Sequence, residues 1–367
     1  MSPGRAPEGT GGSARGDAAS RIAAEWSERT HPFRAGKALG PGAGLFGHYA
    51  QILPIGRERI VMTADGIGTK IEIAERLGRY DTLGYDLLAM VTDDLAALGA
   101  EPCVVSNVLD VSVLDDDIVE QLFRGLHDAA KLAGIAVVGG EIAELGDRMA
   151  GHGASMHFAW SATCVGHLPD GWEPIDGSAV LPGNAVLAVR ERGFRSNGFS
   201  TLRRGLEAAF GARWHEIPCD GGTWGEVLLT PSLVCAPLVV ALRTAGVPLT
   251  GIVHVTGGGI PSKLGRVLRA TGHGATLSHL LPPPAPMQAF VDLVGMSPID
   301  AYNTFHMGPA MLFVLPEADV ERAIAQAAEV GHRLEPVGRI DAEPGIRIHT
   351  TGGELLELAP STAWSRT

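Results

Sequence analysis

The sequence predicts an α/β protein with two domains. Short apolar runs typical of buried strands alternate with amphipathic stretches of helical period along most of the chain. A length of 367 residues with 45% hydrophobic side chains provides for a large core and favours two domains over one. We place these domains at residues 31–172 and 173–345. Residues 1–30 are a Gly- and Ser-rich leader that we expect to be disordered, and residues 346–367 form a last strand and a tail.

Charge and composition exclude several classes of function. The formal net charge of −12 argues against non-specific nucleic-acid binding, because surfaces that bind nucleic acid are basic. We find neither an apolar run long enough to span a bilayer nor a secretory signal, and we therefore expect a cytoplasmic protein. The four cysteines lie far apart without a metal-binding spacing, which favours buried, reduced thiols.

Two glycine-rich segments stand out in the first domain. Gly40–Gly47 matches the pattern G-x-G-x-x-G, but no strand precedes it, so we interpret it as a loop that closes over a site or as a plain linker. The apolar run Ile60–Met62 then leads into Asp65-Gly66-Ile67-Gly68-Thr69-Lys70. Gly66 and Gly68 let the backbone turn sharply and approach a ligand. The acid, the hydroxyl and the ammonium group around them suit a metal-bridged polyphosphate.

More acids follow in the same domain. Asp86 and the pair Asp93-Asp94 belong to a helix predicted over residues 81–98, and a second helix is predicted from an Asp115 cap to residue 133. A predicted buried strand over residues 135–138 then runs into Gly139-Gly140-Glu141. Carboxylates placed together in this way either repel one another or share a cation.

The second domain repeats the pattern of a strand followed by a polar or glycine-rich turn. The loop Gly193–Gly198 contains Arg195, Ser196 and Asn197 and leads into a helix from Phe199. A helix is predicted to start near Pro231. The strand Ile252–Val255 runs into Thr256-Gly257-Gly258-Gly259 and then a helix to residue 269, a geometry that binds phosphate or carboxylate.

The ordered set of motifs resembles the phosphoribosylformylglycinamidine cyclo-ligase (AIR synthetase) family over residues 44–341. The motifs that carry the resemblance are Asp65–Lys70, Tyr80–Asp86, Gly99–Pro102, Gly139–Glu144, Ser196–Ser200, Thr256–Gly259 and Thr304-Phe305. The resemblance implies two α/β domains, a homodimer formed through the first of them, and the use of ATP and Mg²⁺. It also implies a small-molecule substrate and an ATP-dependent ring closure in purine biosynthesis.

Site residues follow from the positions that match these motifs. The resemblance implies catalytic roles for Asp65, Lys70 and Asp94, with Asp65, Asp94 and Glu141 as metal-associated acids. Implied cofactor contacts are Gly66, Gly68, Thr69, Asp86, Gly139, Gly140 and Glu141. The implied substrate cleft contains Arg195, Ser196, Asn197, Thr256, Gly257, Gly258, Gly259 and His306.

Several positions depart from the family pattern. Asp93 stands where the pattern has Asn, Asn107 where it has Asp, and Arg195 where it has His. Asn303 and His306 replace Arg and Asn around Thr304-Phe305. We therefore expect the nucleotide chemistry to be retained and the substrate end to have changed. Two alternatives to the cyclo-ligase remain: a paralogue that phosphorylates another substrate, similar to thiamine monophosphate kinase, and a non-catalytic nucleotide-binding regulator.

Overall fold

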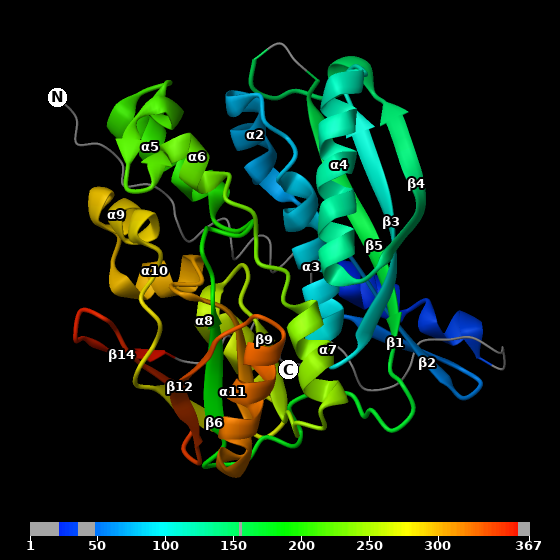
Figure 1. The fold of residues 1–367 in the computed structure, drawn as a ribbon, viewed down its shortest axis with the longest axis vertical. Coiled ribbons are helices and arrows are strands. Elements are labelled where there is room, and N and C mark those ends of the chain that lie inside the picture. Colours follow the sequence, from blue (N-terminus) through cyan, green and yellow to red (C-terminus); the bar gives the residue numbers. More distant parts are fainter. Residues whose placement is uncertain (1–21, 36–47, 154–155, 359–367) are drawn as a thin grey trace.

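The computed structural model describes residues 22–35, 48–153 and 156–358. The Gly40–Gly47 segment therefore lies outside the described residues, as do most of the predicted leader and the end of the tail. The described chain forms two large β-sheets, which occupy different halves of the molecule (Figure 1). Ahead of the first sheet lie helical residues 22–28 and the short 3₁₀ helix η1 (His31–Arg34).

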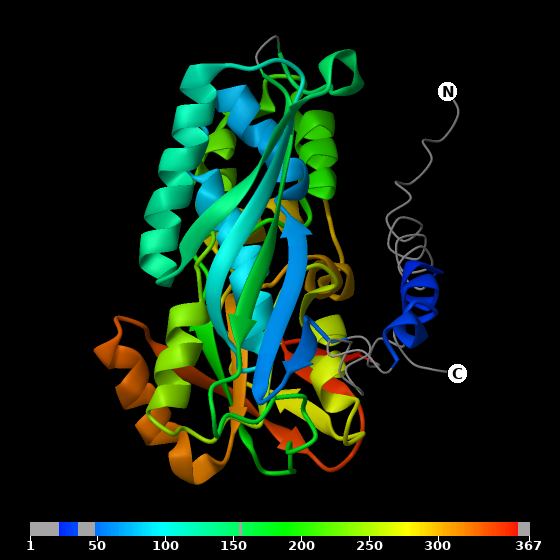
Figure 2. The ribbon, with the colours of Figure 1, turned by 90° about the vertical axis from the view of Figure 1, so that its right-hand side faces the viewer.

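The first sheet has five strands in the order β1-β2-β5-β3-β4. All neighbours are antiparallel except β3 and β4, which run parallel and are joined by helix α4. Helix α3 packs against β2 and β5, and α4 packs against α3 (Figures 1 and 2). The elements are β1 (Gln51–Ile55), β2 (Glu58–Gly66), η2 (Gly68–Lys70), α2 (Ile71–Leu77), α3 (Leu83–Ala97), β3 (Glu101–Val111), α4 (Asp116–Ala133), β4 (Ala136–Glu144), η3 (Gly146–Arg148) and β5 (Phe158–His167).

Local signals in the sequence set both ends of α4, as predicted. The Asp115 side chain accepts hydrogen bonds from the backbone N–H groups of Asp117 and Ile118, which would otherwise lack partners at the start of the helix. Gly134 ends the helix in the left-handed conformation, with φ of 70°.

The second sheet has seven strands in the order β14-β13-β10-β12-β6-β11-β9. The two strands after residue 345 belong to this sheet, since β13 pairs with β10 and with β14. The elements are β6 (Ala185–Arg190), α5 (Phe199–Phe210), η4 (Trp214–Glu216), β7 (Pro218–Cys219), β8 (Gly222–Thr223), α6 (Trp224–Leu228), α7 (Ala236–Thr244), β9 (Gly251–His254), α8 (Gly259–Leu268), β10 (Gly274–Leu277), α9 (Ala285–Leu293), α10 (Pro298–Thr304), β11 (Pro309–Leu315), η5 (Glu317–Asp319), α11 (Val320–Glu329), β12 (Leu334–Asp341), β13 (Ile346–His349) and β14 (Leu355–Leu358).

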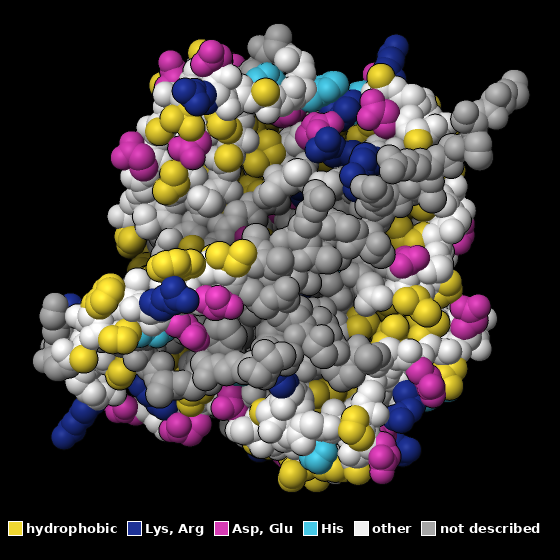
Figure 3. Space-filling model, turned by 180° about the vertical axis from the view of Figure 1, so that it is seen from behind, with side chains coloured by type: hydrophobic (Ala, Val, Ile, Leu, Met, Phe, Trp, Pro, Cys, Tyr) yellow, Lys and Arg dark blue, Asp and Glu magenta, His cyan; other side chains and the backbone are white. Residues whose placement is uncertain are grey.

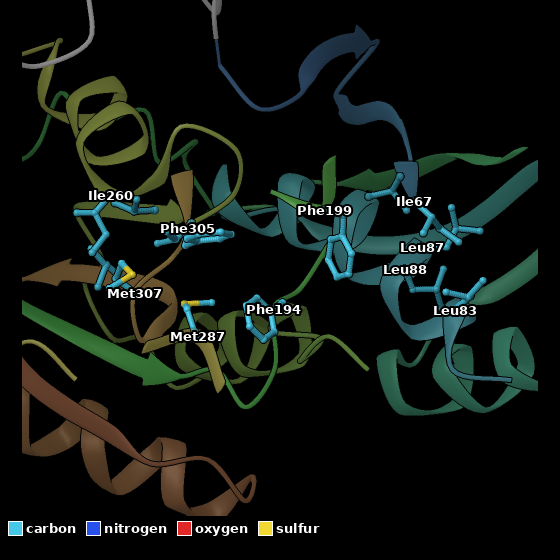
Figure 4. Packing of buried hydrophobic residues seen from close by; sticks show 14 of the residues in the cluster. Ile67, Leu83, Leu87, Leu88, Phe194, Phe199, Ile260, Met287, Phe305 and Met307 are labelled. Carbon is cyan, nitrogen blue, oxygen red and sulfur yellow. The ribbon is translucent and has the colours of Figure 1, made fainter. Parts of the chain in front are cut away.

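A continuous hydrophobic core joins the two sheets and their helices. In Figure 4, Phe199 lies between side chains of the first domain, such as Ile67 and Leu87, and the aromatic rings of the second domain. Phe194 and Phe305 belong to the same cluster, and each is only 1% exposed. Because apolar side chains from both domains pack against one another, the relative position of the domains is part of the fold.

Two predicted elements are wrong. The helix expected near Pro231 starts only at Ala236, because the backbone N–H groups of Ser232 and Cys235 donate to buried carboxylates of α3 across the domain interface. The strand expected to be buried over residues 135–138 is instead the exposed edge strand β4, which continues through Gly139-Gly140-Glu141 to Glu144. An apolar run alone does not distinguish an edge strand from a central one.

Acidic and basic side chains lie interspersed on the face shown in Figure 3. Across the residues that the structure describes, no helix combines the length and the apolar composition that a membrane crossing requires.

Candidate functional site

The candidate site lies where helix α3 of the first domain meets the second domain. The helix is almost wholly buried, and it carries Asp86, Asp93 and Asp94. Asp86 and Asp93 are seven residues apart, so two helical turns bring them to the same face. That face contacts the segment 230–235, which precedes helix α7.

Lys70 lies buried beside this contact. Its ammonium group donates to Asp86 Oδ1 at 2.8 Å and to the carbonyl oxygen of Thr230 at 2.7 Å. Ser232 donates to the same carboxylate oxygen from its backbone N–H, at 3.2 Å, and from its hydroxyl. Burial lowers the pKa of Lys70 and raises the pKa of Asp86, and the charge of each partner opposes the shift. Lys70 and Asp86 thus link the two domains, and a contact between Lys70 and phosphate stays a prediction.

Arg195 forms a second buried link between the domains. Only 1% of its surface is exposed. Its guanidinium group donates to Glu191 at 2.9 Å, to Asp93 at 3.0 Å and to the carbonyl oxygen of Leu233 at 3.1 Å. Arg195 was predicted to line the substrate cleft, and the structure places it inside the interface with protein groups around it.

Asp94 lies close enough to Asp65 to influence the ionisation of Asp65. Asp94 Oδ1 is 2.8 Å from His254 Nδ1. Burial raises the pKa of Asp94 to about 7, and the charge of Lys263 is the largest effect that opposes it. The pKa of Asp65 is also raised, mainly by loss of water around the carboxyl group and further by Asp94, although the residue keeps contact with solvent. A cation beside these two carboxyl groups would favour their charged forms.

Glu141, Gly139 and Gly140 lie apart from this pair of acids. All three belong to the exposed edge strand β4. Within residues 22–35, 48–153 and 156–358, no group of three or more His, Cys, Asp or Glu side chains is arranged to hold a metal ion. The structure therefore does not gather Asp65, Asp94 and Glu141 into one cluster within this chain.

The two polar loops of the second domain lie side by side. A Cβ atom placed on Gly257 would be 3.4 Å from Asn197 Oδ1. In the described part of the chain, the buried Ser196 Oγ and Asn197 Nδ2 atoms have no hydrogen-bond partner. Unpaired buried polar atoms are costly, and a ligand that pairs them would remove that cost.

The triple-glycine turn needs its last glycine for two reasons. Gly259 has φ of 61°, in the left-handed region, and a Cβ atom there would collide with the carbonyl oxygen of Tyr302. Thr256 precedes the turn and is buried, and Gly258 caps helix α8. The loop around Asp65 also reaches this region, because Thr69 Oγ1 lies 3.4 Å from the hydroxyl oxygen of Ser200.

Sequence reasoning missed two basic residues of α8. Lys263 and Arg266 act electrostatically on Asp94, and both lie over the ring of Tyr49, at 5.9 Å and 4.6 Å from its centroid. Their spacing of three residues places them on one helix face, directly after a phosphate-type turn. This spacing after the triple-glycine turn is the sequence feature from which the two residues could have been predicted.

His306 is buried beneath the loop that carries Ser196 and Asn197. Its Nε2 atom donates to the carbonyl oxygen of Gly193 at 2.9 Å, and its Nδ1 atom accepts the N–H of Gly308 at 3.0 Å. Burial lowers its pKa to about 4, so the ring is neutral. In this structure His306 supports the loop, and a direct contact with substrate stays a prediction.

Two cavities lie near the domain interface. One of about 540 Å³ lies between α4 and α7, and its lining includes Leu132 and Val240. The other, of about 280 Å³, borders the Gly193 loop and is lined partly by Arg192 and Thr230. The candidate site is defined by the polar residues described above rather than by the larger cavity, whose lining includes neither Asp65 nor Asp94.

Comparison with known proteins identifies the family. The model for the N-terminal domain of AIR synthase related proteins matches residues 47–168, and the model for the C-terminal domain matches residues 182–351. A phosphoribosylformylglycinamidine cyclo-ligase of Thermococcus kodakarensis is 32% identical over 326 residues, which cover 89% of this chain and 92% of the relative. The enzyme of the same name from Sorangium cellulosum is 34% identical, over 84% of this chain and 88% of the relative.

Solved structures show the same fold at lower sequence identity. The crystal structure of a HypE–HypF complex matches with a TM-score of 0.63 and 16% identity, covering 86% of this chain and 93% of the other. A thiamine-monophosphate kinase from Stenotrophomonas maltophilia matches with a TM-score of 0.59 and 20% identity, covering 92% and 96%. The two domain models and the relatives that are at least 30% identical extend over most of the sequence. The chain therefore belongs to the AIR synthase related family.

Proposed function

We propose that this protein is an ATP- and Mg²⁺-dependent phosphoribosylformylglycinamidine cyclo-ligase of the cytoplasm. It converts formylglycinamidine ribonucleotide to aminoimidazole ribonucleotide in purine biosynthesis. One observation carries this proposal: relatives named for this activity are 30–34% identical to the chain along 83–92% of its length. The similarity therefore extends through both domains and includes the loops at their interface.

The chemistry needs positioning more than it needs a reactive side chain. The formyl oxygen of the substrate attacks the γ-phosphorus of ATP, an O–P bond forms, and ADP leaves. The amidine nitrogen then attacks the activated carbon, the ring closes, that nitrogen loses a proton, and phosphate departs with the former formyl oxygen. Phosphorylation makes that oxygen a good leaving group, and the protein contributes by holding the reactants and by offsetting the phosphate charge.

Asp65 and Asp94 fit a role as the acids that hold Mg²⁺ with the nucleotide. Mg²⁺ in phosphoryl-transfer sites commonly uses one or two protein carboxylates and takes its other ligands from phosphate and water. Two neighbouring carboxyl groups with raised pKa values match that donor set. When bound, Mg²⁺ offsets charge on the phosphate oxygens. Asp65 and Asp94 would hold and orient the ion, and Gly66, Gly68 and Thr69 would line the approach of the nucleotide.

Residues of the second domain fit the substrate. Ser196 and Asn197 offer the unpaired Oγ and Nδ2 atoms described above. Thr256–Gly259 offers a turn ahead of the N-terminus of the ten-residue helix α8, where N–H groups favour an anion. Lys263 and Arg266 add positive charge on the face of α8 that influences Asp94.

We also propose that the enzyme is a homodimer formed through β4. This strand is an edge of its sheet, and exposed apolar side chains lie on it and on neighbouring segments. They are Val108, Val113, Leu114, Val137, Val138, Ile142 and Leu145. An exposed apolar edge strand invites pairing with another chain. A second copy seated there would enclose Glu141 together with Gly139 and Gly140.

The proposed function is tested by supplying the purified protein with formylglycinamidine ribonucleotide, ATP and Mg²⁺. We expect equal amounts of ADP, phosphate and aminoimidazole ribonucleotide. Asp94→Asn, verified as folded by circular dichroism, should lose ring formation. Protein that binds ATP but forms no ring product would refute the proposal. ADP release with a different acceptor would then indicate the kinase-like paralogue, and bound ATP without turnover would indicate the regulator.

A further inference from the structure

A chain of buried polar contacts crosses the domain interface from Glu191 to Asp94. Glu191 pairs with the Arg195 guanidinium group at 2.9 Å, and Arg195 Nη2 lies 2.8 Å from His254 Nε2. On the other side of the same ring, His254 Nδ1 lies 2.8 Å from Asp94 Oδ1. Arg195, Glu191 and His254 are each at most 2% exposed, so water does not compete for these contacts.

Hydrogen-bond donors and acceptors fix the proton position on the His254 ring. A guanidinium group has only donors, so His254 Nε2 must accept from Arg195 and cannot carry a proton. The imidazole is therefore neutral, and its single N–H is on Nδ1. That N–H points at Asp94 Oδ1, which accepts it.

The backbone at Arg195 shows that the surrounding structure enforces this arrangement. Arg195 has φ of 55°, in the left-handed region that non-glycine residues rarely occupy. Such a conformation persists where several contacts together hold it. Here four acceptors do so, namely Glu191, Asp93, Leu233 and His254.

We propose that Arg195 and His254 are positioning residues for Asp94. Arg195 places the imidazole proton of His254 on Nδ1, and His254 orients the Asp94 carboxylate by donating that proton to Oδ1. Partners of this kind orient ligating carboxylates and affect metal affinity. The metal role of Asp94 rests on the proposed function, whereas the contacts and the ring proton do not.

An ion pair between the two domains also belongs to this network. Asp93 and Arg195 form it at 3.0 Å, and both side chains are buried. Asp93 also accepts the N–H groups of Cys235 and Ala236, at 2.8 and 2.9 Å. A buried cation in one domain is thus matched by a buried acid in the other. Each of these two buried charges therefore depends on the other for its counter-charge.

The first experiment measures the ring proton in the unmodified enzyme. The ¹⁵N NMR spectrum of protein labelled at histidine distinguishes an Nδ1–H ring from an Nε2–H ring, and loss of one signal set in His254→Asn assigns His254. We expect the ring proton on Nδ1. A proton on Nε2 would overturn the proposal irrespective of what the enzyme catalyses.

The second experiment separates a positioning role from a packing role. In His254→Asn, the amide N–H group can lie near the former Nδ1 position and face Asp94. In His254→Gln, the longer side chain places its amide near the former Nε2 position, toward Arg195, and Asp94 loses its donor. We expect His254→Gln to weaken Mn²⁺ affinity, measured by electron paramagnetic resonance, and to lower kcat by about 10–100-fold. His254→Asn should recover most of the affinity and of kcat that His254→Gln loses, and the surface control His127→Asn should match wild type. Equal losses in both His254 variants would contradict positioning.

The third experiment tests the matched pair by a double-mutant cycle. Asp93→Asn and Arg195→His each leave a buried partner without its counter-charge, and the combination removes both members of the ion pair. We expect the double variant to recover unfolding temperature and kcat relative to Arg195→His alone, because coupled residues are non-additive. If the two single losses simply add, Asp93 and Arg195 do not compensate each other.

Discussion

Lys70→Met tests whether Lys70 is a structural link or a phosphate contact. The variant removes the ammonium group that bonds Asp86 at 2.8 Å and Thr230 at 2.7 Å, and it leaves Asp86 buried without its counter-charge. Loss of one partner of a buried ion pair typically costs about 3–5 kcal/mol. Ser232 still donates to Asp86, so we expect a value near the lower end, about 3 kcal/mol.

The assay is thermal unfolding followed by circular dichroism. At about 2–4 °C per kcal/mol for domains of this size, Lys70→Met should lower the unfolding temperature by about 6–12 °C. Lys131→Met, at an exposed lysine of α4, is the matched control and should unfold like wild type. Lys70→Met combined with Asp86→Asn should regain part of the loss, because the uncompensated charge is gone.

Activity measurements then decide between the two roles. If Lys70 acts mainly as a link, the folded variant keeps a KM for ATP close to wild type at temperatures below its transition. An unchanged unfolding temperature together with a loss of more than about 100-fold in kcat/KM for ATP would refute this reasoning. That outcome would instead support the predicted contact between Lys70 and phosphate.

Three further changes test other parts of the structure. The pKa of Asp94 is about 7 in the folded state against 3.8 as its ordinary value, so its contribution to stability is lost as pH rises from about 4 to 7. In the absence of metal, the difference in unfolding temperature between wild type and Asp94→Asn should therefore shift against wild type as the pH rises over that range. A difference that stays constant would contradict a raised pKa of the Asp94 carboxyl group. Val138 on β4 is 63% exposed in this chain, so Val138→Lys should place a charge in the proposed interface without disturbing the fold. Light scattering should then show a folded monomer in place of the dimer, and an unaltered mass would exclude that interface. Asn107 is buried and donates to the Gly139 carbonyl oxygen, a bond that a carboxylate cannot make. Asn107→Asp should therefore lower the free energy of unfolding in urea by about 1–3 kcal/mol. Wild-type stability of the variant would show that this bond contributes little.

Much of the fold could be predicted from the sequence because its signals are local. The Asp115 cap, Gly134 and the apolar period between them define α4, and the helix has the predicted bounds. The strand, triple-glycine turn and helix around Thr256–Gly259 also form as expected. The family followed from motifs whose order along the chain is itself information, and comparison with known proteins confirms it.

Predictions failed where the outcome depends on distant partners. Residues 230–235 lack a helix because carboxylates on α3 take their N–H groups, and those carboxylates are about 140 residues away in sequence. Residues 136–144 are exposed because no further strand pairs with β4 within the described chain, which an apolar run cannot reveal.

By itself, the sequence determined that this chain has two α/β domains, belongs to its family, and carries acidic and glycine-rich loops suited to a nucleotide and a cation. These features are encoded by neighbouring residues and by motif order. Only the tertiary structure decided that Asp93 and Arg195 form one ion pair, that Lys70 bonds Asp86, and that the charges of Lys263 and Arg266 act on Asp94. Charge complementarity between residues far apart in sequence depends on how the two domains pack, and packing brings groups together that no local pattern connects.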